Sequence, residues 1–321
     1  MCGTKEELKT YLSDKVLGIH EGELNKYDNI DLFVNACALY AEKYGEECID
    51  LIDDLEDSYD KYQVFSRCIA SFQWRKVRYI PVDSFVDLIN KYRCTRDDVW
   101  QMLIGNSVKV THPMNADYLH EFLSGYPLDK RDYNWTCYIN GLTGYDSDRI
   151  IQLIQIYDQG EKLDNVNEKQ IELLLTLFGW ILTSSNRWLR DHTSKAMIEI
   201  LKEHFHLCQP ILMKFKDVND PYVIQRLYGI VFGACCKRNP EENLQPLAEY
   251  VYSTIFDQEK VYPDILLRDY ARLIIERFLV EEPDYSGLIH REKIIPPYNS
   301  DPIPEIEEQH YLVFYQVRNK Q

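Results

Sequence analysis

The stretch from Arg187 to His192 holds the side chains of this chain that most readily suggest chemistry. Arg187, Arg190 and Asp191 are charged, and His192 stands beside them. A histidine next to a carboxylate can act as a general acid or base, so the group invites a catalytic interpretation. Its position, between a turn at Thr183 and a run with a helical apolar stripe, also suits a structural role.

Recurrence favours the structural role. Arg190, Arg226 and Arg268 stand near the starts of three predicted helices and are separated by 36 and 42 residues. This period is typical of HEAT-like helical pairs. Polar residues near the helix starts can link one repeat to the next. We therefore interpret the following residues as an inter-repeat polar ladder: Arg187, Arg190, Asp191, Asp220, Arg226, Arg268 and Asp269.

Three further residues near these helix starts are candidates for contact with a partner. His192 has no counterpart in the other two copies. Trp188 and Tyr222 are aromatic, and aromatic side chains are enriched at protein interfaces. We expect a role in interaction for His192, Trp188 and Tyr222 and assign no residue to catalysis.

Other chemical signals in the sequence are weak. His204, His206 and Cys208 cannot converge on a metal if they lie on one helix, because residues i and i+2 point to different faces. The Cys235-Cys236 pair lies in an apolar, buried-looking helix, where a thiol is inert. The carboxylates between Asp53 and Asp60 lack the ligand spacing of a calcium loop. No P-loop, GxSxG, HExxH or GxGxxG string occurs. We expect neither a metal nor a cofactor.

The formal net charge is -16, and it is unevenly distributed. Residues 1–60 hold 16 Asp and Glu against 5 Lys and no Arg, a net charge of -11. Nucleic-acid affinity comes largely from Lys and Arg that neutralise phosphates, so this balance disfavours a nucleic-acid groove. The nine cysteines show no disulfide spacing, and we find neither a signal peptide nor an apolar run long enough for a membrane span. These features predict a protein of the reducing cytoplasm.

Apolar residues recur at helical spacing along most of the chain. The predicted helices are 30–44, 62–74, 84–92, 95–107, 111–123, 147–157, 167–182 and 196–207, with others that contain Trp135 or begin at Asp220 and Asp264. A further apolar run covers 46–57, and Pro113 is expected in the first turn of 111–123. This succession predicts an all-α fold, an α-solenoid of HEAT/armadillo-like helical pairs.

Composition divides the chain into three predicted regions. Residues 1–94 form acidic N-terminal helical repeats, and residues 95–280 form the central HEAT-like repeats. Residues 281–321 form an irregular, Pro-rich and acidic arm. Within that arm, Tyr311 to Val317 is strand-like and could add to the sheet edge of a partner or pack on the last repeat.

Four strings also resemble the helical-repeat region of large bacterial STAND-type NTPases, including AVAST-like antiviral proteins. They are 112–120 (HPMNADYLH), 183–191 (TSSNRWLRD) with Lys195-Ala196, 220–228 (DPYVIQRLY) and 266–272 (LLRDYAR). The resemblance covers residues 95 to 300 and implies a sensor-like array that recognises a foreign protein. Nucleotide hydrolysis and effector activity are not implied, because the P-loop and the effector are missing.

The sequence supports three functional hypotheses. The first is a non-catalytic, cytoplasmic repeat module that binds a protein, with a role in bacterial defence. The second is a HEAT-like enzyme or binder that acts on nucleic acid, which would need a basic concave groove. The third is an architectural piece of a larger NTPase. We expect a protein partner, no membrane and no small molecule.

Overall fold

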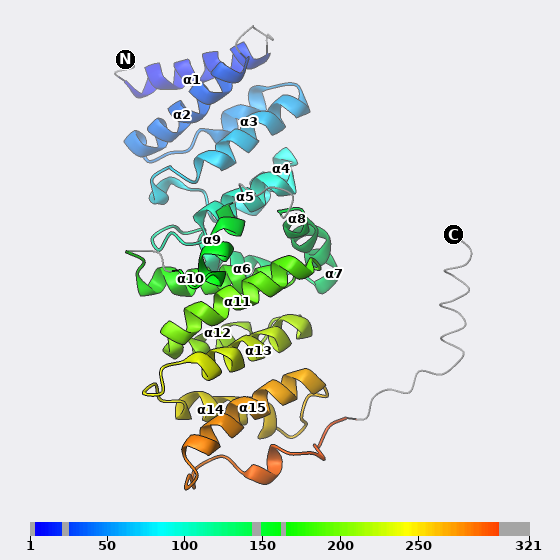
Figure 1. Ribbon diagram of the computed structural model, residues 1–321. Helices are drawn as coiled ribbons and strands as arrows, with labels where there is room; N and C mark the ends of the chain where they lie inside the picture. Colours follow the sequence, from blue (N-terminus) through cyan, green and yellow to red (C-terminus); the bar gives the residue numbers. More distant parts are fainter. Residues whose placement is uncertain (1–3, 21–25, 143–148, 162–164, 302–321) are drawn as a thin grey trace, which may run out of the picture. The chain divides into compact units, whose positions relative to one another are not determined.

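In a computed structural model the chain is described for residues 4–20, 26–142, 149–161 and 165–301 (Figure 1). Every regular element within these ranges is helical and none is a strand, which confirms the predicted all-α fold class. The α-helices are α1 (Lys5–His20), α2 (Lys26–Tyr44), α3 (Ser58–Ser71), α4 (Phe85–Tyr92), α5 (Arg96–Asn106), α6 (Ala116–Ser124), α7 (Leu128–Arg131), α8 (Cys137–Asn140), α9 (Arg149–Asp158), α10 (Glu168–Ile181), α11 (Arg187–Glu203), α12 (Cys208–Phe215), α13 (Pro221–Lys237), α14 (Gln245–Val251) and α15 (Ile265–Glu281).

Short polar side chains fix where several of these helices begin. Asn167 accepts from the Gln170 amide at 2.9 Å, while the Gln170 side chain accepts from the Asn167 amide, which completes a capping box before α10. Asp264 caps α15 through the Leu267 amide at 2.8 Å. Asp220 accepts from the Val223 amide at 3.3 Å, with Pro221 in the first helical position of α13. These caps satisfy amides that have no partner within the helix.

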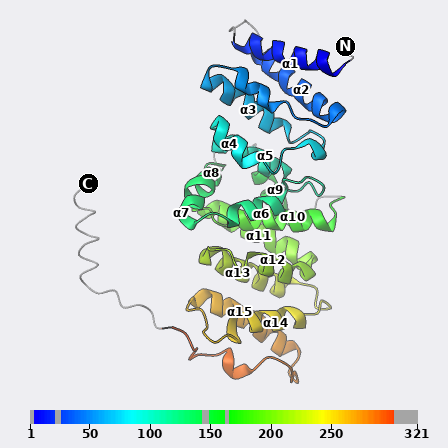
Figure 2. The same cartoon turned by 180° about the vertical axis from the view of Figure 1, so that it is seen from behind.

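The chain forms two compact units. The first comprises residues 1–200 and 217–223, and the second comprises residues 201–216 and 224–321. Within the first unit, α1, α2 and α3 follow one another side by side, and α5 lies between α3 and α6 (Figures 1 and 2). Within the second, α14 packs against both α12 and α15. The predicted boundaries after residues 94 and 280 remain sequence-based predictions.

Helix α10 forms the apolar centre of the first unit. All side chains from Leu173 to Ile181 are buried, as expected for a helix that is apolar on nearly every side. The buried Trp135 donates from its indole to the Trp180 carbonyl at 3.0 Å. The Trp180 indole in turn donates to His120 Nδ1 at 3.2 Å. The indole N–H groups of both buried tryptophans therefore have hydrogen-bond acceptors within the core.

Two local predictions are wrong. Helix α6 begins at Ala116 behind an Asn115 cap, so Pro113 precedes the helix and does not lie in its first turn. Here the side chain of Asn115 provides the stronger start signal, because it accepts from the Asp117 amide at 2.9 Å. Helix α11 ends at Glu203, so Phe205 and Cys208 do not share one helical stripe with Met197. The predicted helix that contains Trp135 is present, because α7, the π-helix Asp132–Thr136 and α8 follow one another without a break.

The arm after α15 is irregular over residues 282–301, apart from the 3-10 turn Arg291–Lys293. It is nevertheless tied to the second unit. The Val261 amide donates to the Asn299 carbonyl at 2.8 Å, and the Tyr285 hydroxyl donates to Glu249 at 2.7 Å. The strand-like run Tyr311 to Val317 lies outside the described residues.

Two further features bear on the sequence-based expectations. None of the helices that the structure describes is long and apolar enough to cross a bilayer. The eight described cysteines are all free. Cys137 and Cys236 are exposed, so the interpretation of Cys236 as a buried thiol is wrong. Its neighbour Cys235 is buried, and this burial raises the pKa of the Cys235 thiol to about 12.

Candidate functional site

Arg190 joins two segments of the first unit. Its guanidinium donates to the Ser184 carbonyl at 2.8 Å and lies 5.4 Å from the centre of the Tyr222 ring. The Tyr222 side chain remains 41% exposed on its other side. Arg190 thus connects the turn before α11 with the start of α13. The Tyr222 ring is held in a defined position while it still faces solvent.

Asp220 lies in a buried polar network that the sequence did not reveal. Its carboxylate is 3.2 Å from Arg131, a residue that is fully buried. The Arg131 guanidinium also donates to the Asn219 side chain and lies 5.3 Å from the Trp180 ring. Burial raises the pKa of the Asp220 carboxyl, and the charge of Arg131 opposes this increase. Arg131 was missed because its partners are almost ninety residues further along the chain.

The other ladder residues have different surroundings. Arg187 pairs with Asp191 at 3.3 Å, and Asp269 pairs with Arg272 at 2.6 Å, each on its own helix. Neither of these two pairs joins two helices. The Arg187 side chain is almost entirely exposed, so its pair with Asp191 contributes little to stability.

In the second unit, Arg268 links α15 to the arm, because it donates to the Ser300 hydroxyl at 3.1 Å and lies 4.8 Å from the Tyr298 ring. Arg226 is half-buried on α13. Its neighbour Gln225 donates to Asp264 at 3.3 Å and so joins α13 to the cap of α15.

Two of the predicted interaction residues come together on α11. Trp188 and His192 lie one helical turn apart, and the centres of their rings are 4.2 Å apart. His192 Nδ1 lies 2.5 Å from a carboxylate oxygen of Asp158, the last residue of α9. Tyr222 contacts Arg190 and is not part of this group. We call Trp188, His192 and Asp158 the Trp188 cluster.

The helix that carries the Trp188 cluster starts from a fixed turn. The Asn140 side chain accepts from the Ser184 hydroxyl at 2.6 Å and from the Ser185 amide at 3.0 Å. Asn186 then caps α11 through the Leu189 amide at 3.3 Å. Because α8 supplies Asn140, the first turn of α11 and the position of Trp188 are set by contacts outside the helix.

The geometry of the Trp188 cluster suits binding of a partner better than it suits catalysis. The contact with Asp158 orients the His192 ring, as a carboxylate does in many catalytic dyads. The hydrogen-bond partner of His192 is Asp158 and its ring partner is Trp188, and neither carries a hydroxyl or thiol nucleophile. The cluster presents a 39% exposed indole that contacts an oriented ring at a tilt of 36°. Trp is among the residues that contribute most to binding energy at interfaces.

The candidate metal ligands His204, His206 and Cys208 have the following geometry. His204 and His206 lie in and beside the 3-10 turn Phe205–Leu207, and not on one helix as expected, with ring centres 6.3 Å apart. Cys208 is buried at the start of α12. Over the described ranges, no group of three or more His, Cys, Asp or Glu side chains is placed to hold a metal ion.

Comparison with protein-family models, with curated proteins and with solved structures found no match for this chain.

Proposed function

We propose that the protein is a non-catalytic helical-repeat module that binds another protein, and that the Trp188 cluster is a central contact. The observation that carries this proposal is the geometry of the indole, which is exposed and yet lies against the ring of His192, a residue that Asp158 holds in place. A side chain that is already ordered loses less entropy when a partner binds, so its contacts contribute more to affinity.

Tyr222 supports the same function on another part of the first unit. Its ring is fixed by Arg190 and remains exposed, and Tyr and Arg are also enriched among interface residues. The resemblance to STAND-type sensor regions extends the proposal to a role in bacterial defence, in which the partner is a foreign protein.

Quantitative affinity capture tests the proposed function. The immobilised protein is incubated with extracts of phage-infected and uninfected bacteria, and bound proteins are measured by mass spectrometry. We expect Trp188→Ala to reduce recovery of a specific partner by about tenfold, as for a typical interface hot spot. Tyr262→Ala is the matched control, since Tyr262 is an exposed aromatic residue of the second unit. Equal recovery with both variants, or recovery that disappears after nuclease treatment, would contradict the proposal.

A further inference from the structure

The turn Phe72–Arg75 at the end of α3 is fixed by buried contacts on one side. Arg75 is buried; its Nε donates to the Ser71 hydroxyl at 2.7 Å, and its Nη1 lies 3.0 Å from Glu47. The Ser71 hydroxyl donates in turn to the Cys68 carbonyl at 2.5 Å. The Arg75 guanidinium also lies 5.4 Å from the Phe72 ring. The turn therefore has little freedom on the side facing Glu47.

The segment after α5 fixes the same turn from its other side. His112 Nε2 lies 2.8 Å from the Phe72 carbonyl, and Lys109 donates to the Gln73 carbonyl at 2.6 Å. The Gln73 side chain packs so closely on α5 that a Cβ added at Gly105 would lie 2.9 Å from it. Two consecutive carbonyls of the turn are thus held by two side chains from a neighbouring segment.

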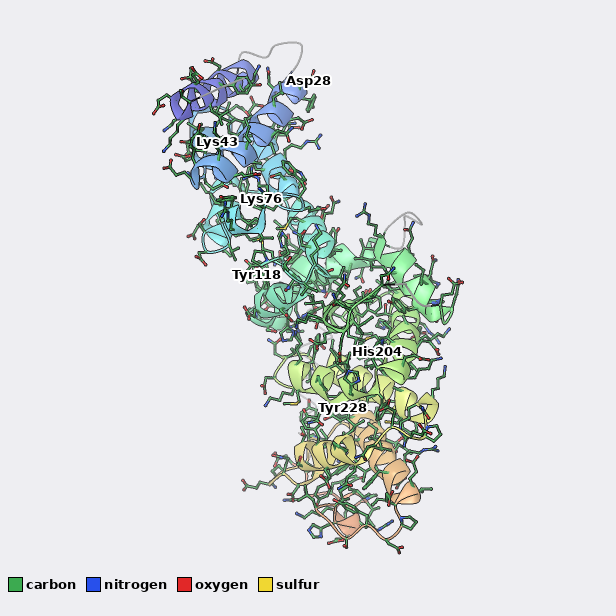
Figure 3. The ribbon with its side chains drawn as sticks, turned by 90° about the vertical axis from the view of Figure 1, so that its left-hand side faces the viewer. Asp28, Lys43, Lys76, Tyr118, His204 and Tyr228 are labelled. Atoms are coloured by element: carbon green, nitrogen blue, oxygen red, sulfur yellow. The ribbon has the colours of Figure 1, made fainter. Side chains whose placement is uncertain are left out.

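The residue that follows these carbonyls, Trp74, projects into solvent. It is 58% exposed and, unlike Trp188, has no ring contact within the described residues. Val77 and Val110 are also exposed on the two segments that form this part of the first unit. Figure 3 locates the turn by the label of Lys76, whose neighbour Glu42 belongs to the end of α2. A rigid backbone with an uncovered indole suits the anchor of a binding site.

The basic residues that follow Trp74, together with Lys109 and Arg149, whose charge acts on Lys109, differ in how their charge is compensated. Arg75 pairs with Glu47, and Lys76 pairs with Glu42. Arg78, Lys109 and Arg149 make no ion pair with any described carboxylate. Burial, and then the charge of Arg149, lower the pKa of Lys109, and no carboxylate counteracts them. The positive charge of these three residues is therefore available to a ligand, although the chain as a whole carries a net charge of -16.

We propose that Trp74, with Val77, Val110 and the cations Arg78, Lys109 and Arg149, binds a peptide segment in which carboxylates alternate with apolar residues. The indole and the two valines cover the apolar side chains of the ligand, and the cations pair with its carboxylates. This binding site is additional to the Trp188 cluster, so the proposal does not depend on the function proposed for that cluster.

A peptide suits this site better than a nucleic acid does. Three cations are few compared with the six to ten phosphate contacts common in DNA binding. An exposed Trp can nevertheless stack on a base, so a single-stranded oligonucleotide belongs in the test.

Fluorescence anisotropy with a labelled peptide of three Glu-Asp-Leu-Gly repeats tests this inference on the full chain. We expect saturable binding at low salt that weakens as salt rises. Trp74→Ala should weaken binding about tenfold or more. The double charge reversal Arg78→Glu with Arg149→Glu should have an effect of similar size. Tyr262→Ala, which changes an exposed aromatic residue of the second unit, should leave the affinity unchanged. Circular dichroism checks that each variant is folded.

Three results would overturn the inference. They are the absence of saturable binding, equal affinity for a peptide of Gln-Asn-Leu-Gly repeats, and equal affinity of the wild-type and Trp74→Ala proteins. Tighter binding of an oligo-dT of matched length would assign the site to nucleic acid instead. The capture experiment with Trp188→Ala is a separate measurement, so the failure of either proposal can be recognised without the other.

Discussion

Trp74 and Trp188 are the two exposed tryptophans of the protein, and the structure presents them in opposite ways. At Trp74 the backbone is fixed by buried side chains, and the ring itself is uncovered. At Trp188 the ring lies against the ring of His192, which is held by the half-buried Asp158. Changes around Trp74 should therefore affect the stability of the fold. Changes around Trp188 should affect binding and leave the fold largely intact.

Replacement of Arg75 should produce the largest effect. Arg75→Met removes the buried partner of Glu47, and burial already raises the pKa of that carboxyl. We expect a loss of about 3 kcal/mol in the free energy of unfolding, as for other broken buried ion pairs. Urea denaturation followed by circular dichroism measures it. Arg78→Met is the control on an exposed arginine. An equally large loss in the free energy of unfolding of that variant would show that the burial of Arg75 is not the cause of its effect.

His112→Leu tests the other support of the Trp74 turn. The imidazole contacts the Phe72 carbonyl through Nε2 and accepts from the Met114 amide at Nδ1 (3.1 Å). Loss of both contacts leaves two buried backbone groups without a partner. We expect a loss of roughly 2 kcal/mol in the free energy of unfolding at pH 7.5. A loss below the error of the denaturation curves would show that the turn does not depend on His112.

The same histidine predicts a dependence of stability on pH. Burial lowers the pKa of His112 in the folded protein below its usual value of about 6.5. At a pH between the lowered and the usual pKa, the unfolded chain binds a proton that the folded chain does not. The contribution of His112 is therefore complete above about pH 6.5 and decreases as the pH falls below it. The difference between the wild-type protein and His112→Leu, measured from pH 7.5 to 5, should become smaller. A constant difference would contradict this assignment.

Asp158→Asn should have a small effect on stability and a larger one on binding. The pair with His192 is partly exposed, so we expect a change below about 1 kcal/mol in the free energy of unfolding. The less constrained His192 ring should weaken capture of the partner severalfold. Asp191→Asn, which removes an exposed pair on the same helix, is the matched control. If both variants reduce capture equally, the orientation of His192 is not the cause.

Trp74→Ala and Trp188→Ala should have the smallest effects on stability. Each residue is exposed, and surface substitutions usually change the free energy of unfolding by no more than about 0.5 kcal/mol. Urea denaturation of both variants checks this. A loss above about 1.5 kcal/mol at either residue would mean that its ring supports the fold and is not free to bind.

The sequence predicted those features that depend on residues close together along the chain. The helix starts predicted at Asn167, Asp220 and Asp264 coincide with side-chain caps, in which cap and amide lie within three residues of each other. Continuous hydrophobicity likewise identified α10 as buried. The helix start predicted from Pro113 was wrong because Asn115, two residues further along the chain, caps the helix instead.

The contacts that form the two candidate sites could not be predicted in the same way. His192 and Trp188 were identified, but Asp158 lies 34 residues away on α9. The contacts that hold the Trp74 turn join residues 28 to 40 positions apart in the sequence. Trp74 was expected at the end of an amphipathic helix, where an aromatic residue more often packs inward. Only the folded arrangement shows that its ring faces solvent.

Photo-crosslinking from Lys195 tests the central claim, protein binding through the Trp188 cluster, most directly. Lys195 is exposed on α11, one turn beyond His192, so benzoylphenylalanine at this position leaves the cluster intact. The same group at Met213, an exposed residue of the second unit, is the control. We predict a discrete protein adduct from position 195 that is absent from position 213 and is lost when Trp188→Ala is added. An adduct that persists in Trp188→Ala, or one that nuclease removes, would contradict the account.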